Sequence, residues 1–307
     1  MEKVIVVIGP TSVGKTKMGV ALAKKFNGEV ISGDSMQIYK QMDIGTAKVT
    51  EEEKEGIIHH CVDILNSDET YSVHDFQQTV RKKITEITQR GHVPIIVGGT
   101  GLYIKAALYD YQFDEMENDH HAINEKYKDY TNEQLHDHLK SIDEESAKTL
   151  HFNNRRRVLR AIEIYETTGK RKSEMLEEQE HICLYDAYFV GLTLPRDVLY
   201  ERINKRVDVM MENGLKEEME RLYSQGLTRN HQSMKAIGYK EWVDYYDHQI
   251  DLNDVLELIK KHSRQYAKRQ YTWFKNQFDV HWYDVNLENF EQTIEQVTDD
   301  IEKILKV

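Results

Sequence analysis

Eight residues near the start of the chain have the types and the spacing of a phosphate-binding loop (P-loop). They match the pattern G-x-x-x-x-G-K-[ST] in full, and they are Gly9, Pro10, Thr11, Ser12, Val13, Gly14, Lys15 and Thr16. The glycines let the backbone turn its N–H groups toward phosphate oxygens, Lys15 supplies a point charge, and the Thr16 hydroxyl is placed to hold Mg²⁺. The motif therefore predicts a substrate that carries a diphosphate or a triphosphate.

The sequence does not show the second magnesium-binding feature of ordinary ATPases and GTPases. That feature is an apolar strand that ends in Asp. The best candidate strand, PIIVGGT at residues 94–100, ends in Gly98, Gly99 and Thr100 instead. This gap argues against an ordinary ATPase or GTPase.

Asp34 and Thr100 each follow an apolar run, and each has a functional and a structural interpretation. Asp34 could bind Mg²⁺ through water, act as a general base, or be a plain helix N-cap before a turn. The two glycines before Thr100 suit close contact with a ligand, but they also suit a simple turn. Gly33 and Gly45 suggest that the loop after Asp34 approaches something closely, which favours a functional role.

Basic side chains are concentrated in a few short segments of the chain. Arg202 and Arg206 lie four residues apart, so they share one helix face, which is either solvated or functional. Further basic segments lie at 155–160 (RRRVLR), 235–240 (KAIGYK) and 258–278. Cations spaced in this way neutralise backbone phosphates, and aromatic rings can stack on an unpaired base. For Trp273 and Phe274, packing in the core is the favoured interpretation.

The elements that would position these residues alternate between strand and helix. Strand patterns cover residues 3–8, 29–32 and 93–97, and helical patterns cover 16–26 and 72–90. The alternation predicts an α/β fold with a P-loop NTPase-like parallel sheet as its core. Ligands of such sheets bind at the carboxyl ends of the strands, where the P-loop, Asp34 and Thr100 would all lie.

The rest of the chain predicts a division into two domains. Residues 111–181 show no strand pattern, so we expect a helical insertion domain. Residues 1–110 and 182–307 would form the α/β core. Its second part would contain a strand within 183–194, helices up to about residue 275, a last strand near 281–283 and a terminal amphipathic helix.

Composition limits the class of protein. The 307 residues are 39% hydrophobic and 31% charged, which is typical of a globular chain. No apolar run approaches the roughly 20 residues that span a bilayer, so we expect a cytoplasmic protein without a membrane partner. The two cysteines form no CxxC motif, which excludes a disulfide scaffold and a zinc finger. A net charge of −12 argues against nucleic acid, but the basic segments can still hold a polyanion locally.

Several segments together resemble the tRNA dimethylallyltransferases, the bacterial tRNA isopentenyltransferases. The resemblance runs along almost the whole chain and occurs in the order found in the family, which makes it far more specific than the P-loop alone. Its motifs are GPTSVGKT (9–16), ISGDSMQIYKQMDIGTAK (31–48), IIVGGTGLY (95–103), RRRVLRAIEIYETTGK (155–170), ERINKRVDVMMENGL (201–215), KAIGYKE (235–241) and SRQYAKRQYTWF (263–274).

The resemblance implies a reaction and roles for several residues. The family moves a dimethylallyl group from dimethylallyl diphosphate to the N6 amine of the tRNA adenosine just 3′ of the anticodon. Asp34 would hydrogen-bond N6 and act as general base. Thr100 and Arg206 would stabilise the diphosphate together with Lys15 and the P-loop amides. These roles agree with the chemistry, because charge develops on the diphosphate as the allylic C–O bond breaks.

The resemblance also implies how tRNA is bound. The helical insertion would clamp the anticodon stem-loop, and we expect the protein to act as a monomer. Implied tRNA contacts are Asp34, Ser35, Met36, Gln37, Thr100, Arg156, Arg157, Arg160, Lys235, Gly238, Tyr239 and Lys240. One departure concerns an arginine that many relatives carry near the start of the insertion. No arginine occurs here between Arg90 and Arg155, and His120 or His121 falls near that place.

Three other functions remain open on the sequence. A P-loop kinase would use ATP on a small molecule, a related isopentenyltransferase would act on free AMP, and an RNA-binding module would have no catalytic activity. The missing strand-terminal Asp counts against the kinase. The basic segments 235–240 and 264–274 count against a free nucleotide as acceptor, and the complete P-loop counts against a pure binding module.

Overall fold

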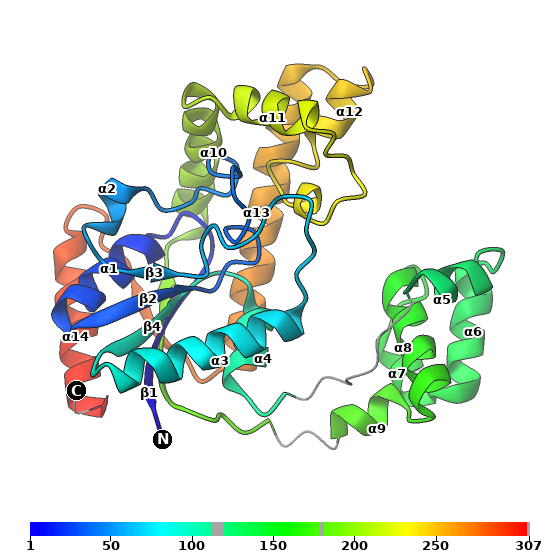
Figure 1. Ribbon diagram of the computed structural model, residues 1–307, viewed down its shortest axis with the longest axis horizontal. Helices are drawn as coiled ribbons and strands as arrows, with labels where there is room; N and C mark the ends of the chain where they lie inside the picture. The colour runs from blue at the N-terminus through cyan, green and yellow to red at the C-terminus, as the bar shows by residue number, and fades with distance from the viewer. Residues whose placement is uncertain (112–119, 178–180, 306–307) are drawn as a thin grey trace. The chain divides into compact units, whose positions relative to one another are not determined.

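The computed structural model describes residues 1–111, 120–177 and 181–305 (Figure 1). The chain divides into two compact units. The core unit contains Met1–Tyr109 and Cys183–Val307, and the insertion unit contains Asp110–Ile182. Each boundary lies one residue from the one expected from the sequence.

A parallel sheet forms the centre of the core unit, which confirms the predicted α/β class. Within the described residues its order is β3-β2-β4-β1-β5-β6, and every neighbouring pair is parallel. The strands are β1 (Lys3–Ile8), β2 (Gly28–Ser32), β3 (His59–His60), β4 (Val93–Val97), β5 (Asp186–Thr193) and β6 (His281–Asp284). After β4 the chain crosses to the other side of β1, so the P-loop after β1 lies at the switch point where such sheets bind ligands.

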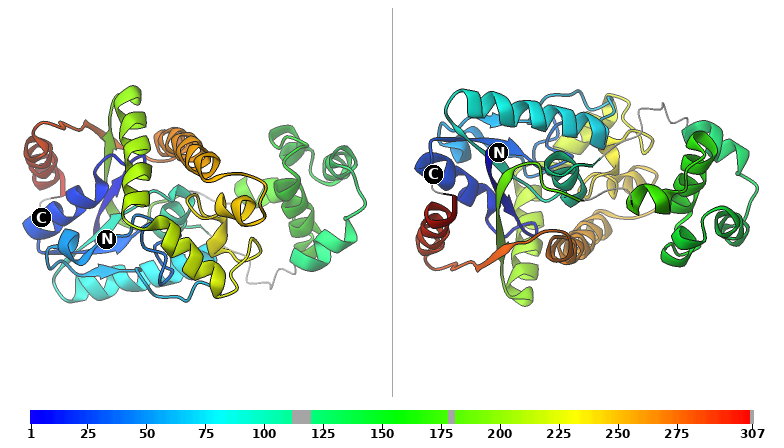
Figure 2. Two further views of the ribbon diagram at one scale, coloured as in Figure 1. Left: turned by 90° about the horizontal axis from the view of Figure 1, so that it is seen from above. Right: turned by 90° about the horizontal axis from the view of Figure 1, so that it is seen from below.

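Both faces of the sheet are covered, and the alternation of side chains along β1 shows how. Val4, Val6 and Ile8 belong to one buried cluster, which includes Phe76 and Ile84 of α3 (Val73–Gln89). Ile5 and Val7 belong to the other cluster, with residues of α1 (Lys15–Lys25) and α14 (Phe290–Leu305). Figure 2 shows α1 beside α14 on one side of the sheet and α3 on the other. The buried run VIVVI is therefore apolar at every position, as expected for a central parallel strand.

The helices of the core unit differ little from the expected ones. Helix α3 begins after Ser72, whose side chain accepts from the Asp75 N–H in a capping box. The other helices are α1 (Lys15–Lys25), α2 (Glu51–Lys54), α4 (Gly101–Leu108), α10 (Arg196–Glu212), α11 (Leu215–Ser224), a 3₁₀ turn (Ser233–Lys235), α12 (Trp242–Tyr246), α13 (Leu252–Gln277) and α14 (Phe290–Leu305).

The insertion unit is helical in its described part, as predicted. It has its own buried cluster, in which Leu135 and Leu139 pack with Val158 and Ile162. Its helices are α5 (His120–Lys126), α6 (Asn132–Ile142), α7 (Glu144–Thr149), α8 (Arg155–Thr168) and α9 (Lys172–Glu177).

Two structural observations concern membrane spans and cysteine pairing. In the described ranges no helix combines the length and the apolar character that crossing a bilayer would need. Cys61 and Cys183 are both free, and Cys61 is buried.

Candidate active site

The P-loop joins β1 to α1 in a conformation that only certain residues allow. Gly9 and Gly14 have φ values of 145° and 106°, and Ser12 between them has a φ of 67°. A Cβ atom on Gly9 would lie 2.5 Å from the Leu192 carbonyl oxygen, so no larger residue fits there. Lys15 opens α1, and its Nζ donates to the Pro10 carbonyl at 2.8 Å. The loop and the helix N-terminus thus have an arrangement that suits a phosphate group, and phosphate binding itself stays a prediction.

Helix α10 brings two arginines to this loop from far along the chain. The Arg206 Nη1 donates to the Thr11 Oγ1 at 3.2 Å, and the Arg202 Nε donates to the Ser12 carbonyl at 3.0 Å. The shared face of the two arginines is therefore turned toward the P-loop. This placement favours the functional interpretation of the face over the solvated one.

Two cavities adjoin the P-loop in the core unit. The larger has a volume of about 750 Å³ and is lined by the P-loop, Arg206 and part of the loop that follows β2. The smaller, of about 240 Å³, has an apolar wall that includes Ile203, Val207 and Ile259. Residues that line both cavities are Thr11, Ser12, Asp34, Thr46, Ala47, Arg206, Met210 and Tyr266. The site therefore combines a cationic phosphate end with a smaller apolar compartment.

Asp34 and Thr100 meet at the carboxyl ends of β2 and β4. The Asp34 Oδ1 accepts from the Met36 N–H at 2.8 Å and closes a turn, but the next helix begins only at Glu51, so the helix N-cap interpretation is wrong. The residue also lines both cavities, so the turn does not replace a functional role. The Thr100 Oγ1 accepts from the Ser35 N–H at 3.1 Å, which ties Thr100 to the loop that carries Asp34.

The glycines before Thr100 are required mainly by packing of the protein. A Cβ on Gly98 would lie 2.3 Å from the Gly33 carbonyl oxygen. A Cβ on Gly99 would lie 2.2 Å from the Gln270 Nε2. Gly98 and Gly99 also line the larger cavity, so close contact with a ligand remains open beside this packing role.

Burial and nearby charges alter the pKa of three groups at the site. Desolvation, helped by the positive charge of Arg206, lowers the pKa of Lys15 to about 7, although Asp34 acts in the opposite direction. Burial also lowers the pKa of Arg206, and the negative charge of Asp34 opposes that shift. Burial and the nearby Asp34 raise the pKa of Tyr266 to about 12. The site therefore has an excess of positive charge that an anionic ligand would balance.

Two residues of α13 connect the parts of the site, and sequence reasoning missed them. The Gln270 Oε1 accepts from the Thr11 N–H at 2.9 Å, while its Nε2 donates to the Gly99 carbonyl at 3.0 Å. The Tyr266 hydroxyl donates to the same carbonyl at 3.2 Å. Both lie in the segment 264–274 that the sequence assigned to RNA binding. Their spacing of four residues was the available signal, because it places them on one helix face.

The aromatic residues that follow in α13 pack as predicted. Phe274 is fully buried. Trp273 lies against Gly101, where a Cβ would come within 2.2 Å of the indole ring. Core packing is therefore confirmed for both residues.

The tRNA contacts implied for the core unit fall into two groups. Ser35, Met36 and Gly238 line the smaller cavity and Gln37 the larger, while Lys235 and Lys240 are exposed. Tyr239 corrects the prediction, because it has no exposed surface and its hydroxyl donates to Glu218 at 2.6 Å. It supports the neighbouring loop from inside instead of offering a surface to RNA.

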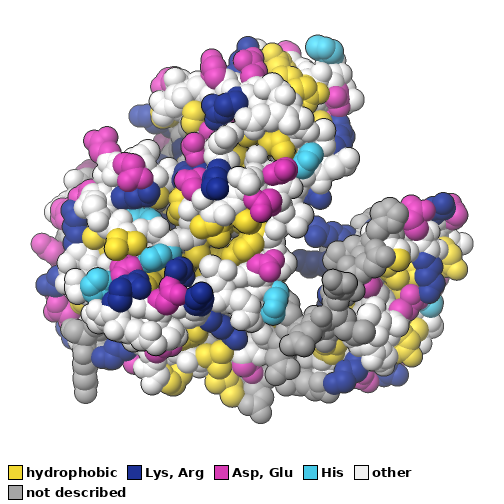
Figure 3. Space-filling view, viewed as in Figure 1, with side chains coloured by type: hydrophobic (Ala, Val, Ile, Leu, Met, Phe, Trp, Pro, Cys, Tyr) yellow, Lys and Arg dark blue, Asp and Glu magenta, His cyan; other side chains and the backbone are white. Residues whose placement is uncertain are grey.

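The basic side chains of the insertion unit also differ in availability. Arg156 and Arg157 are exposed at the start of α8. The Arg160 Nη1 pairs with the Glu163 Oε2 at 2.8 Å, and Arg155 donates to the Tyr127 and Tyr130 carbonyls. The side chains of His120 and His121 lie outside the described residues. On the face of the molecule in Figure 3, acidic and basic side chains are interspersed.

The donor set at the P-loop fits the magnesium ion that the motif implies. Thr16 lines the larger cavity, and Asp34 lines it from the opposite loop. Mg²⁺ commonly takes one or two protein oxygens and completes its octahedron with phosphate oxygens and water. Among the described residues no group of three or more His, Cys, Asp or Glu side chains forms an all-protein metal cage. A magnesium ion here would therefore be held together with the phosphate groups of a bound ligand.

Comparisons with known proteins agree on one family. A model of the family described as IPP transferase matches residues 37–277. Proteins named tRNA dimethylallyltransferase from Bacillus cereus and Bacillus anthracis are each 54% identical over 287 residues, which cover 92% of this chain and 90% and 91% of theirs.

Solved structures show the same likeness in three dimensions. The tRNA isopentenylpyrophosphate transferase of Staphylococcus epidermidis is 47% identical with a TM-score of 0.74, covering 99% of both chains. A eukaryotic dimethylallyltransferase acting on tRNA is 33% identical with a TM-score of 0.86, covering 99% of this chain and 79% of its own. The chain described here therefore belongs to the IPP transferase family.

Proposed function

We propose that this tRNA-modifying transferase moves a dimethylallyl group from dimethylallyl diphosphate to N6 of the adenosine directly 3′ of the anticodon. The observation that carries the proposal is the pair of adjoining cavities, which share Asp34 and Arg206. A phosphate-binding end, an apolar compartment and a carboxylate then lie in one site. Those are the three features that an allylic diphosphate and an amine acceptor require.

The diphosphate would bind at the P-loop as a leaving group. Its oxygens would accept from the loop amides, while Lys15 and Arg206 balance the charge that develops when the C1–O bond breaks. Arg206 is already held against the loop by its hydrogen bond to Thr11, so little reorganisation is needed. Thr100 would support the diphosphate site indirectly, because its Oγ1 accepts from the Ser35 N–H.

Thr16 would hold Mg²⁺ through its hydroxyl together with the diphosphate, and Asp34, which lines the same cavity, would act on the ion through water. When bound, the ion supplies further positive charge to the leaving group. The protein's own share is to orient the diphosphate so that its C1 carbon points toward the acceptor. The apolar side chains of Ile203, Val207 and Met210 in the smaller cavity offer a surface for the dimethylallyl group.

Asp34 would act on the acceptor. As the N6–C1 bond forms, the N6 nitrogen becomes positively charged and its proton passes to the Asp34 carboxylate, while diphosphate leaves with the electron pair of the C1–O bond. The adenosine must leave the RNA stack to reach this site, which costs a few kcal/mol and is cheaper for a loop base than for a paired one.

The remaining roles belong to the same proposal. Asp34–Gln37, Thr100, Lys235 and Lys240 would contact the anticodon stem-loop from the core unit, and Arg156, Arg157 and Arg160 from the insertion unit. Arg160 would have to share its guanidinium with Glu163. We place the protein in the cytoplasm, where its tRNA substrate would be found, and expect it to act as a monomer.

One assay separates this function from its competitors. The protein is incubated with labelled dimethylallyl diphosphate, Mg²⁺ and an anticodon stem-loop that has adenosine after the anticodon. The matched control is the same stem-loop with guanosine at that position. We expect label only in the adenosine-containing RNA. Transfer to free AMP without transfer to RNA would favour the nucleotide-modifying alternative, and ATP-dependent phosphorylation of a small molecule without either transfer would favour the kinase.

A further inference from the structure

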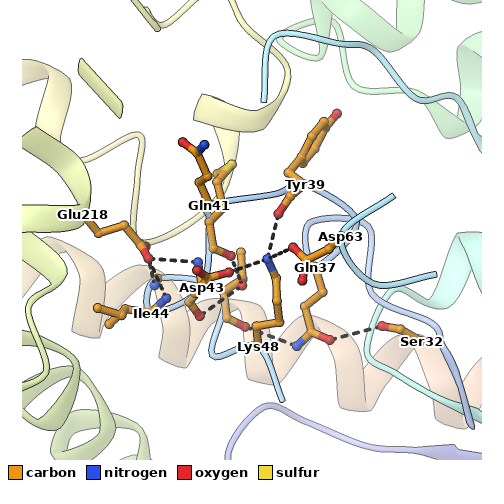
Figure 4. Close-up of polar contacts among 12 residues, drawn as sticks. Ser32, Gln37, Tyr39, Gln41, Asp43, Ile44, Lys48, Asp63 and Glu218 are labelled. Carbon is orange, nitrogen blue, oxygen red and sulfur yellow. Dashed lines mark hydrogen bonds and ion pairs between the residues drawn. The ribbon is translucent and has the colours of Figure 1, made fainter. Parts of the chain in front are cut away.

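Glu218 of α11 is a buried carboxylate that binds the backbone of a distant loop. Its Oε2 accepts from the N–H groups of Asp43 and Ile44, each at 2.9 Å, and its Oε1 accepts from the Gly45 N–H at 3.1 Å. The Tyr239 hydroxyl donates to Oε1 at 2.6 Å. Figure 4 shows Glu218 reaching from its helix toward Asp43 and Ile44.

The energetics of this contact make it specific. Glu218 is only 2% exposed, and a buried carboxylate is costly unless its oxygens are satisfied by donors. Four donors satisfy it here, and hydrogen bonds to a charged acceptor are about twice as strong as neutral ones. Gly45 fits closely against Tyr239, where a Cβ would lie 2.5 Å from the ring. Loop and partner therefore meet in one defined arrangement.

The held segment belongs to a loop, residues 34–48, that is also closed on itself. The Gln37 Nε2 donates to the Thr46 and Ala47 carbonyls at 3.4 and 3.3 Å, and its Oε1 accepts from the Ser32 hydroxyl at 3.1 Å. Near the end of the loop, the buried Lys48 Nζ contacts the Tyr39 carbonyl, Asp43 and Asp63 at 2.6–2.7 Å (Figure 4). Residues 43–45 are therefore linked to Gln37, because Gln37 donates to the carbonyls of the next two residues, Thr46 and Ala47.

The 34–48 loop forms one wall of the candidate active site. Asp34, Thr46 and Ala47 line both cavities, Met36 and Gly45 line the smaller, and Gln37 lines the larger. Glu218 and Tyr239 contact this loop but line neither cavity. They can affect the reaction only by fixing the position of the loop.

We propose that Glu218, supported by Tyr239, is a positioning residue for group transfer, because it holds the 34–48 loop so that Asp34 and Gln37 face the acceptor adenosine. The inference rests on the proposed function. It predicts a defect in the chemical step and in RNA engagement, and not in the binding of dimethylallyl diphosphate, because the P-loop has its own supports in Gln270 and Arg206.

The test compares Glu218→Gln with Glu220→Gln, an exposed glutamate of the same helix that pairs only with Lys216 at 3.5 Å among the described contacts. An amide at position 218 keeps one acceptor oxygen but replaces the other with an NH2 group, which faces loop N–H donors that a carboxylate oxygen accepted from. We expect kcat to fall about 10- to 100-fold, as for a small misplacement of a catalytic group. The KM for dimethylallyl diphosphate should stay near the wild-type value, and Glu220→Gln should match the wild type in both constants.

Amide hydrogen exchange gives a readout that does not depend on activity. Exchange at residues 43–45 should become faster in Glu218→Gln and stay unchanged in Glu220→Gln. Unchanged exchange, or a kcat equal to that of Glu220→Gln, overturns the inference. Failure of the wild-type protein to label RNA would instead contradict the proposed function.

Tyr239→Phe covers the case in which Glu218→Gln does not fold. It removes one hydrogen bond and leaves the three backbone donors on Glu218. Per folded enzyme, we expect a smaller fall in kcat with an unchanged KM for dimethylallyl diphosphate. A wild-type kcat in this variant would then overturn the role assigned to the pair.

Discussion

Arg206 and Thr11 are joined across two elements that lie almost 200 residues apart: the Arg206 Nη1 donates to the Thr11 Oγ1 at 3.2 Å. The guanidinium is thereby held against the P-loop before any ligand binds. A group that is already in place costs no reorganisation when charge develops on a leaving group, which is what makes such contacts effective in catalysis.

Arg206→Ala should therefore impair diphosphate departure. We expect kcat/KM for dimethylallyl diphosphate to fall by about 10²- to 10³-fold, the range seen when one charge-stabilising donor is removed. Steady-state kinetics with a saturating stem-loop measure the effect. Arg202→Ala is the comparison, because Arg202 contacts the same loop but is exposed. It should lose much less, and wild-type kinetics for Arg206→Ala would assign that face to solvent.

Asp34→Asn separates the two roles of the Asp34 side chain. The asparagine oxygen can still accept from the Met36 N–H, so the turn should survive, but the side chain can no longer take a proton from N6. We expect kcat to fall by about 10²- to 10⁴-fold, the usual contribution of a general base. Stem-loop affinity, measured by fluorescence anisotropy, should change little. An equal loss of turnover and RNA binding would make Asp34 a structural residue.

Because the pKa of Lys15 is lowered, we expect diphosphate binding to depend on pH. The Lys15 pKa of about 7 means that the free protein loses this charge as pH rises through neutrality. A bound diphosphate favours the charged form, so binding should take up a proton above pH 7, and affinity should fall by at most about tenfold per pH unit.

Calorimetry in two buffers of different ionisation heat measures that proton uptake. Near pH 8 we expect close to one proton per diphosphate bound, after correction for titration of the ligand itself. Lys15→Met should abolish the uptake along with most of the affinity. Proton release on binding would contradict the assignment.

The parts of the fold that could be predicted from the sequence are those with a local cause. The buried run of β1 and the glycine spacing of the P-loop can each be recognised from about ten consecutive residues. β3, His59–His60, was missed because two residues have no period. Tyr239 was assigned to RNA because the resemblance implied it for the motif at 235–241, but its partner, Glu218, is brought to it by the fold of α11. Contacts of that kind leave no local pattern.

Glu29 should make the fold sensitive to acid. Glu29 lies near the amino end of β2, away from the candidate active site. It pairs with Arg90 at 2.8 Å, His60 at 2.6 Å and His92 at 2.7 Å. Burial alone would raise the pKa of Glu29, but hydrogen bonds from Arg90 and the two histidines outweigh it and lower the pKa to about 2.

A lowered carboxylate pKa stabilises the folded state above the unfolded value of 4.5, and this stability is lost as pH falls toward 2. The shift corresponds to about 3 kcal/mol, which Glu29→Gln should remove at pH 7. Urea unfolding at pH 7 and pH 3 tests this: the difference between wild type and variant should shrink at the lower pH. Glu55→Gln, at an exposed ion pair with Lys24, is the control and should change little at either pH.

Gln270→Leu tests whether the P-loop and the Gly99 loop must be connected. The variant leaves the Thr11 N–H without its acceptor at 2.9 Å and removes one donor from the Gly99 carbonyl, to which Tyr266 still donates. A fully buried unsatisfied amide costs about 1–3 kcal/mol, and the Thr11 N–H is only partly buried, so the unfolding free energy should fall by no more than that amount.

The kinetic effect should differ from that of Glu218→Gln, for which we expect a lower kcat and an unchanged KM for dimethylallyl diphosphate. Because Gln270 supports the P-loop, the KM for dimethylallyl diphosphate should rise, while stem-loop affinity stays near the wild-type value. Gln270→Glu is a second variant: it keeps the acceptor for Thr11 but adds a negative charge to the cavity where the diphosphate would bind, so its KM should rise as well. Equal KM values in wild type and both variants would show that the connection serves stability alone.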